Sequence, residues 1–246
     1  MEGRWQGQAD SPLTERGLAQ ARELGRALGS DSLAAVYSSD LGRALDTARE
    51  VAASHGLEVT TDPRLRELDV GRWTGRLGAE IRENDPELMA LWRERPADLV
   101  IPEGETLAQA QARALAFLDE RLPAHAGRDV VVITHGALTQ CILVAGMGGS
   151  VADLWLKERI LNCQISRLEW TPRAGLRLVE LSDVRHLSEV GSLTVWRVAD
   201  ARYAPEDTRE VQGVHARGQP QPDEHTRTAG ETHAGEVQAE HPAEAS

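Results

Sequence analysis

The sequence of 246 residues contains only two cysteines, Cys141 and Cys163. Two cysteines cannot build a disulfide framework, and neither has a second cysteine at the spacing of a metal site. No apolar run reaches the length of a membrane span, and the N-terminus lacks the charged and then apolar pattern of a secretory signal. We therefore expect a cytoplasmic protein without a membrane partner.

Basic residues are outnumbered by acidic ones, 27 to 39. The formal net charge is −12 at pH 7, and residues 203–246 account for half of it through nine acidic residues and three arginines. The body of the chain is itself acidic, whereas a nucleic-acid surface needs a basic stripe to neutralise phosphates. We expect no nucleic-acid partner, and any bound phosphate must be held by a few local arginines.

Large apolar residues become rare near the C-terminus. Beyond about Tyr203 the residues Gly, Pro, Gln, Glu and Thr dominate, which is typical of disordered segments. The histidines of this part are too far apart for a preformed metal site, and they are His215, His225, His233 and His241. The sequence predicts one domain over residues 1–202 and a disordered acidic tail over residues 203–246.

The domain alternates between strand-like and helix-like patterns. Apolar spacing predicts helices over 14–28, 41–54, 85–95, 106–122 and 151–160, with another from Ala137. Short apolar or alternating runs predict strands over 34–37, 57–61, 130–133, 164–170 and 176–181. This order indicates a three-layer α/β fold with a mainly parallel sheet and helices on both faces. Residues 65–75 read as irregular, and residues 76–101 as an insertion that can lie over a cleft.

The run Val130 to Ile133 is the centre of this pattern. Four β-branched apolar residues in a row predict a strand buried on both faces. The run ends at Thr134 and His135, and Gly136 allows a sharp turn into the next helix. Ligands of open α/β sheets bind beyond the carboxyl ends of such strands, so His135 is either a ligand-binding group or a packed structural histidine.

Three other positions have chemical and structural interpretations. Arg43 lies near the start of a helix, where free amides and a guanidinium can bind phosphate, or it pairs on the surface with Asp46 or Asp40. Glu67, flanked by leucines, is either a desolvated general acid or an ordinary solvated charge. Gln6 and Gly7 offer an amide and a flexible backbone in the opening loop.

Six groups of residues occur in an order that is specific in combination. They are Gly3-Arg4-Trp5-Gln6-Gly7, Asp10-Ser11-Pro12-Leu13-Thr14, Ser38-Ser39-Asp40-Leu41 with Arg43, Leu65-Arg66-Glu67-Leu68, Pro102-Glu103-Gly104-Glu105-Thr106 and Thr134-His135-Gly136. With this set the chain resembles the histidine phosphatase superfamily, the phosphoglycerate-mutase-like proteins, over about residues 3–190. It is most similar to the branch of broad-specificity phosphatases and probable phosphoglycerate mutases.

The resemblance implies hydrolysis of small phosphate monoesters through a phosphohistidine. It makes Glu67 the proton donor to the leaving alcohol, His135 the second, electrostatic histidine and Arg43 a phosphate clamp. The implied pocket also includes Gln6, Gly7 and Gly136. No metal or cofactor is required, because arginines and histidines neutralise the phosphoryl charge. The implied partner is a small phosphorylated metabolite, and a homodimer is left open.

One part of the family pattern is not found in the sequence. Family members carry a strand and an Arg-His-Gly motif with the nucleophilic histidine before the stretch that matches Gly3. His55, His125 and His186 do not fit the nucleophile's place. The sequence is either a truncated record or an inactive relative that binds phosphate or a partner, and a phosphomutase is the alternative within the family.

We favour truncation, because removing that strand leaves open ladder edges and a slot in the core. The chain as written is then expected to be inactive and to fold poorly.

Overall fold

The computed structural model describes residues 3–154 and 160–188. These residues belong to a compact unit, Met1–Trp196. The predicted domain boundary at residue 202 and the predicted tail with its histidines lie outside the described residues. No helix within the described residues is both long enough and apolar enough to cross a membrane.

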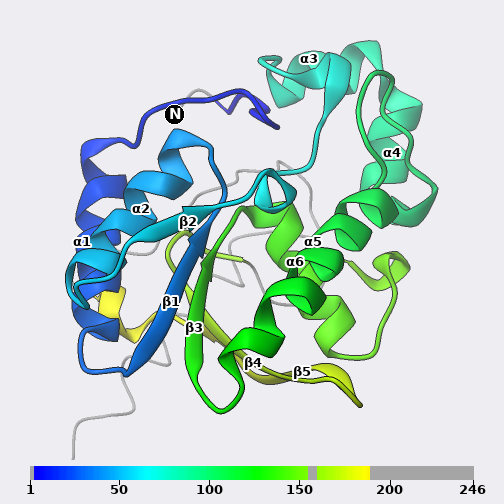
Figure 1. Ribbon diagram of the computed structural model, residues 1–246. Coiled ribbons are helices and arrows are strands. Elements are labelled where there is room, and N and C mark those ends of the chain that lie inside the picture. The colour runs from blue at the N-terminus through cyan, green and yellow to red at the C-terminus, as the bar shows by residue number, and fades with distance from the viewer. Residues whose placement is uncertain (1–2, 155–159, 189–246) are drawn as a thin grey trace, which may run out of the picture. The chain divides into compact units, whose positions relative to one another are not determined.

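The centre of the fold is a parallel sheet with the strand order β2-β1-β3 (Figure 1). β1 (Leu33–Ser38) pairs with β2 (Val59–Thr61) on one side and with β3 (Asp129–Ile133) on the other. Ser38 is level with both Thr61 and Ile133, so the strands end together. The loops that follow them therefore meet at one edge of the sheet.

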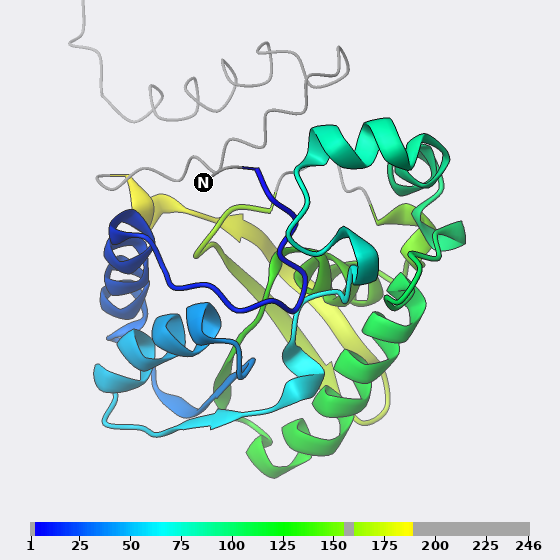
Figure 2. The same ribbon diagram turned by 90° about the horizontal axis from the view of Figure 1, so that it is seen from above.

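Helices α1 (Glu15–Leu28) and α2 (Gly42–Ala53) cover one face of this sheet (Figures 1 and 2). Leu24 and Val51 from these helices form a buried cluster with Val36 of β1. The helices approach closely, because a Cβ on Gly25 would lie 2.6 Å from the carbonyl oxygen of Glu50. Burial of apolar surface fixes this layer.

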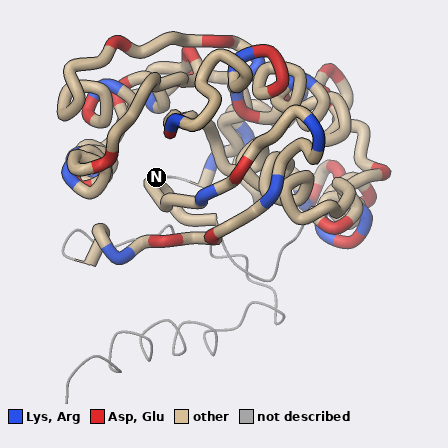
Figure 3. Tube along the Cα trace, turned by 60° about the horizontal axis from the view of Figure 1, so that its bottom comes forward, with Lys and Arg blue, Asp and Glu red and all other residues tan. Residues whose placement is uncertain are grey.

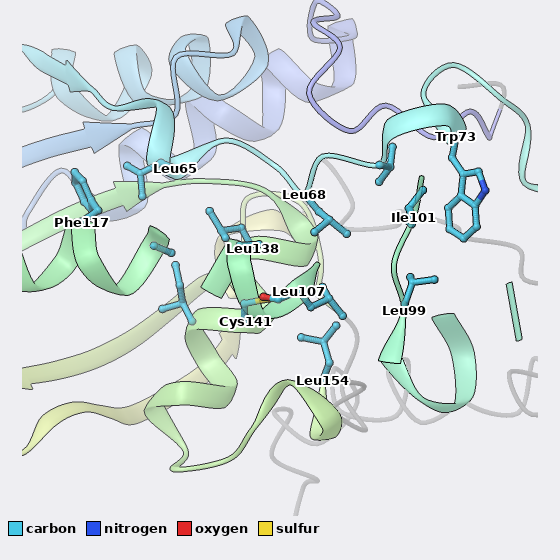
Figure 4. Close-up of a cluster of buried hydrophobic side chains, with 14 of the residues drawn as sticks. Leu65, Leu68, Trp73, Leu99, Ile101, Leu107, Phe117, Leu138, Cys141 and Leu154 are labelled. Carbon is cyan, nitrogen blue, oxygen red and sulfur yellow. The ribbon is translucent and has the colours of Figure 1, made fainter. Parts of the chain in front are cut away.

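Helices α5 (Leu107–Arg121) and α6 (Gly136–Gly146) lie on the opposite face. Their Phe117 and Leu138 belong to the larger apolar core, part of which is shown in Figure 4. Tyr37 of β1 joins this core, while Val36 faces the other one, as the alternation of side chains along a strand requires. The predicted three-layer α/β class is confirmed.

Helices α1 and α5 begin at capping residues that are visible in the sequence. The Thr14 hydroxyl accepts a hydrogen bond from the Gly17 amide at 3.1 Å and begins α1. Thr106 and Gln109 form a reciprocal capping box at the start of α5. These helices lie within one residue of the predicted bounds.

Strands β4 (Ile165–Thr171) and β5 (Gly175–Asp183) form a separate two-stranded antiparallel sheet. They occur at the predicted positions but do not extend the parallel sheet. The turn between Thr171 and Gly175 is too short for a crossover between parallel strands, so it makes a hairpin. Gly175 adopts φ +69° in that turn.

The central strand differs from its prediction. Val130 to Ile133 are half-buried rather than fully buried, and β3 pairs only with β1 among the described residues. Ile165 at the start of β4 nevertheless packs in the same apolar cluster as Val131 and Ile133. The two sheets therefore share a core without a hydrogen-bonded ladder between β3 and β4.

The predicted insertion contains two short helices, α3 (Gly78–Asn84) and α4 (Pro86–Glu94). An isolated antiparallel bridge joins Arg4 to Leu77, so the opening loop lies beside the insertion. Trp5 also packs edge-to-face on Trp73 and Trp92, with ring centroids 5.2 and 5.0 Å apart. A helix is predicted over 151–160, and its described beginning forms a 3-10 turn over Val151–Asp153. Residues 155–159 lie outside the described residues.

Candidate functional site

Glu67 contacts the start of α6, just after His135, at the edge where the parallel strands end. His135 follows β3 and is the N-cap residue of α6, but its side chain makes no cap hydrogen bond. The Glu67 carboxylate supplies that cap, accepting from the Ala137 and Leu138 amides, each at 3.3 Å. It also accepts from the Leu68 amide at 2.9 Å. A helix N-terminus favours a negative group at this position.

The environment of Glu67 favours its neutral form. The residue is half-buried as a whole, but its carboxyl group lies inside the protein. Burial raises the pKa of this carboxyl, while the three amide hydrogen bonds and the nearby Arg43 charge act in the opposite direction. Of the two interpretations of Glu67, the desolvated carboxyl is the one that the structure supports.

His135 is buried, with 8% of its surface exposed, and its Nε2 has no hydrogen-bond partner within the described residues. Burial lowers the pKa of His135 to about 3, and the charges of Arg43 and Arg113 add to this shift. The imidazole is therefore neutral at pH 7 in this structure. A buried polar nitrogen without a partner is costly, and a bound anion that accepts from it would remove that cost.

The Arg43 side chain turns toward the opening loop. Its guanidinium donates to the carbonyl oxygens of Gly7 at 2.9 Å and Ala9 at 2.8 Å. Burial lowers the pKa of Arg43, while the carboxylates of Glu67 and Asp10 raise it. Both proposed surface pairings of Arg43 are wrong.

The expected surface partners of Arg43 are used by other arginines. Asp46 pairs with Arg49 at 2.8 Å, and Asp40 pairs with Arg66 at 2.5 Å. Free amides are expected at the start of this helix, but two of the amides there already have partners. The Leu41 amide donates to Ser39 Oγ at 3.2 Å, and the Gly42 amide donates to Asp10 at 2.9 Å.

Gly7 is a point of close packing in the opening loop. It adopts φ +51°, and a Cβ there would lie 2.6 Å from Cγ2 of Val70. Only glycine fits this position without displacement. Gln6 is half-buried beside it, and its carbonyl accepts from the Ala9 amide. The loop is thus fixed at the site, although no predicted role of Gln6 is tested by its contacts.

The other described histidines are engaged elsewhere. Ring nitrogens of His55 lie 2.9 Å from the carbonyl oxygens of Leu28 and Val51, and His125 bonds the Tyr37 hydroxyl at 2.7 Å. His186 lies 2.9 Å from the Cys163 carbonyl oxygen. Among described residues, no group of three or more His, Cys, Asp or Glu can hold a metal ion.

Two polar residues near the site were not predicted. Gln8 donates to the Glu67 carbonyl oxygen at 3.2 Å, and Arg113 donates to the same oxygen at 3.0 Å. Arg113 lies on a predicted helix, and its carboxylate partner Glu105 belongs to one of the quoted motifs. Nothing in their spacing indicates that they contact the segment of Glu67.

Basic and acidic positions are interspersed along the described chain (Figure 3).

Comparison with known proteins gives one consistent result. The model of the histidine phosphatase superfamily (branch 1) matches residues 1–184. Phosphoserine phosphatase 1 of Hydrogenobacter thermophilus is 37% identical over 153 residues, covering 62% of this chain and 72% of its own. The probable phosphoglycerate mutase GpmB of Yersinia pestis is 34% identical over 192 residues, covering 75% and 87%.

Solved structures agree with these matches. YhfR of Bacillus stearothermophilus superposes with a TM-score of 0.72 at 32% identity, covering 76% of this chain and 92% of its own. A mycobacterial glucosyl-3-phosphoglycerate phosphatase in complex with VO3 superposes with a TM-score of 0.68 at 31% identity, covering 74% and 92%.

Proposed function

This chain belongs to the histidine phosphatase superfamily, and we propose that it hydrolyses small phosphate monoesters through a phosphohistidine intermediate. The observation that carries the proposal is the position of the Glu67 carboxyl. It lies on the amides of Ala137 and Leu138, just after His135 in the chain, and near the charge of Arg43. A desolvated carboxyl next to an anion-binding edge suits proton donation to a leaving alcohol.

Arg43 and His135 would hold the phosphoryl oxygens, and Gln6, Gly7 and Gly136 would line the pocket. A guanidinium has five N–H donors, and the carbonyls of Gly7 and Ala9 accept from only two nitrogens of Arg43, so further donors can face a phosphate. The unpartnered Nε2 of His135 is a second donor once the ring carries a proton on that atom. Gly136, where a Cβ would lie 3.7 Å from Oε2 of Glu67, completes the edge together with Gln6 and Gly7.

In the first step, a histidine nitrogen attacks phosphorus and the bond from phosphorus to the ester oxygen breaks. The neutral Glu67 carboxyl gives its proton to the departing oxygen, and the product is an alcohol. In the second step, water attacks the phosphohistidine, Glu67 accepts a proton from that water, and inorganic phosphate leaves. Positioned cations and donors supply most of the stabilisation that such phosphoryl transfer needs.

The nucleophilic histidine belongs, in this proposal, to a further strand that inserts beside β3. The half-buried apolar side chains of Val130 to Ile133 support this, as does the edge of β3 that has no partner among the described residues. Ile165 of β4 packs against the same cluster without a ladder to β3, which suits a strand between β3 and β4. A histidine at the end of such a strand would lie beside His135.

Hydrolysis of p-nitrophenyl phosphate and of sugar phosphates tests the proposal. A form that carries an upstream Arg-His-Gly segment should release phosphate, and Glu67→Gln in the same form should release much less. Absence of hydrolysis by the folded extended form would contradict the enzyme assignment.

Phosphomutase activity is the second candidate, because the similar GpmB protein is described as a probable phosphoglycerate mutase. The two are separated by the product formed from a phosphoglycerate, which is free phosphate for a phosphatase and an isomeric ester for a mutase. The substrate of this chain is a small phosphorylated metabolite in the proposal, and the cytoplasm is its proposed compartment. An inactive phosphate-binding protein would instead show Arg43-dependent phosphate binding without turnover.

A further inference from the structure

The backbone before Glu67 is held by side chains rather than by secondary structure. Arg113 donates to the carbonyl oxygens of Arg64 at 2.6 Å, Arg66 at 2.7 Å and Glu67 at 3.0 Å. The intervening carbonyl of Leu65 accepts from the Thr134 hydroxyl at 2.8 Å. Four consecutive carbonyl groups are thus bound by side chains from α5 and from the loop after β3.

No helix or strand ladder bonds these four carbonyl groups, and the one further donor to them among the described residues is Gln8, which bonds the Glu67 carbonyl at 3.2 Å. The segment begins in the 3-10 turn Pro63–Leu65 and continues toward the next one, Gly71–Trp73. Backbone polar groups inside a protein must find partners, and here one guanidinium serves three of them. A displacement of that guanidinium would release several backbone bonds at once.

Glu105 fixes Arg113 in turn. Its carboxylate accepts from Nε of Arg113 at 3.0 Å and from Nη2 at 2.5 Å. The same carboxylate accepts from the Asp69 amide at 3.0 Å, and the Glu105 amide donates to the Asp69 carbonyl at 3.0 Å. Only 19% and 17% of these two side chains are exposed, so water competes little with this bidentate pair. The pair therefore holds the backbone on both sides of Glu67, at Arg66 and at Asp69.

We infer that Arg113, held by Glu105, is a positioning residue that keeps the Glu67 carboxyl on the N-terminal amides of α6. The inference deepens the proposed function, since Glu67 is the proton donor there. The bond from Arg113 fixes the backbone at Glu67. From that position the Glu67 carboxylate reaches the amides of Leu68, Ala137 and Leu138. Without Arg113, the carbonyl groups of Arg64 and Arg66 lose their donor and only Gln8 still bonds that of Glu67. The segment can then move outward, and the carboxyl would exchange the protein interior for water.

Positioning and charge have opposite effects on Glu67. If Arg113 acted only through its positive charge, removing it would make ionisation of Glu67 harder and raise the pKa of that carboxyl. If Arg113 positions the segment, removing it lets the carboxyl become solvated, and the pKa falls toward that of an exposed glutamate. The direction of change therefore distinguishes the two roles.

The test is a carboxyl-carbon NMR titration of the full chain, with the Glu67 signal assigned by Glu67→Gln. We expect Arg113→Met and Arg113→Lys both to lower the pKa of Glu67, because lysine keeps the charge but cannot reproduce the planar fork. Arg128→Met is the matched control, since Arg128 donates to the carbonyl of Ala124 at 3.0 Å away from this segment and should leave the titration unchanged.

An unchanged or raised pKa of Glu67 in folded Arg113→Met would overturn the inference. If Arg113→Met does not fold, Arg113→Lys and Glu105→Gln are judged by the same criterion. In an active form, mispositioning should lower kcat by about 10²-fold with little change in KM. The titration requires no turnover, so it judges the role of Arg113 even if the proposed phosphatase activity is not found.

Discussion

The Glu67 carboxylate accepts a hydrogen bond from the Ala137 amide at 3.3 Å, although 70 residues separate the two in the chain. This contact places a carboxyl group at the start of α6, directly after His135. Because burial raises the pKa of Glu67, the contact joins a potential proton donor to the edge at which an anion can bind.

Replacement of Glu67 by glutamine should abolish most hydrolysis while preserving the fold. Glutamine keeps the shape and an acceptor for the amides, but it cannot donate a proton as a carboxylic acid does. A general acid contributes roughly 10²- to 10⁴-fold, so kcat in an active form should fall by about that factor. Steady-state hydrolysis of p-nitrophenyl phosphate measures this. A variant with unchanged kcat would exclude Glu67 as the donor.

The same residue should make stability depend on pH. The pKa of Glu67 is raised in the folded state from its ordinary value of 4.5, so its contribution is fully present below that value and is lost as pH rises through the folded pKa. Urea unfolding of the wild type and Glu67→Gln across this range tests the sign. The difference should shift in favour of the variant as pH rises, and a shift in the opposite direction would contradict burial of the carboxyl.

His135 should have the opposite pH dependence. Its pKa is lowered from 6.5 to about 3, so the neutral folded form contributes stability above 6.5 that is lost as pH falls toward 3. Between these two pKa values the free energy of unfolding should change by about 1.4 kcal/mol per pH unit. The unfolding of His135→Asn should lack this dependence.

Inorganic phosphate should raise the pKa of His135, because a bound anion favours the charged ring. NMR titration of the His135 ring with and without phosphate measures this shift. Arg43→Ala is the companion variant, and it should weaken phosphate binding in calorimetry. An unshifted His135 at saturating phosphate would place the anion elsewhere.

Gly7→Ala should destabilise the protein more than Gly56→Ala. Both glycines have positive φ, +51° and +63°, but a Cβ at Gly7 meets Val70 at 2.6 Å whereas a Cβ at Gly56 meets nothing within 4 Å. The backbone cost is about 1 kcal/mol at each position, and overpacking adds about 1–3 kcal/mol at Gly7 alone. Urea denaturation of the pair measures the difference. Equal losses in the free energy of unfolding would mean that the opening loop shifts away from Val70 at no cost.

Local patterns predicted the elements that depend on local interactions. The β-branched run before His135 predicted β3, and Thr14 predicted the start of α1. Helix α3 was not predicted, since its N-cap is Leu77, whose side chain cannot cap, and its first residue is Gly78. The burial of β3 was overstated because four apolar residues in sequence do not reveal which neighbours cover them.

Contacts at the site depend on residues far apart in the chain, so spacing could not decide them. The two interpretations of Glu67 differ only in whether the start of α6 lies against it, and the partners of Arg43 lie more than thirty residues earlier. The roles expected for Glu67, His135 and Arg43 came from the resemblance to a family, because local patterns do not indicate them. Neither a local pattern nor the resemblance indicated a role for Arg113.

The central claim is that phosphate monoesters are cleaved at this site through a phosphohistidine. The most direct measurement is peptide mass spectrometry, at neutral to alkaline pH, of the native protein after brief reaction with p-nitrophenyl phosphate. The account predicts release of p-nitrophenol and a phosphoryl group on the histidine of an Arg-His-Gly peptide. Absence of p-nitrophenol, with every histidine unmodified, would contradict it.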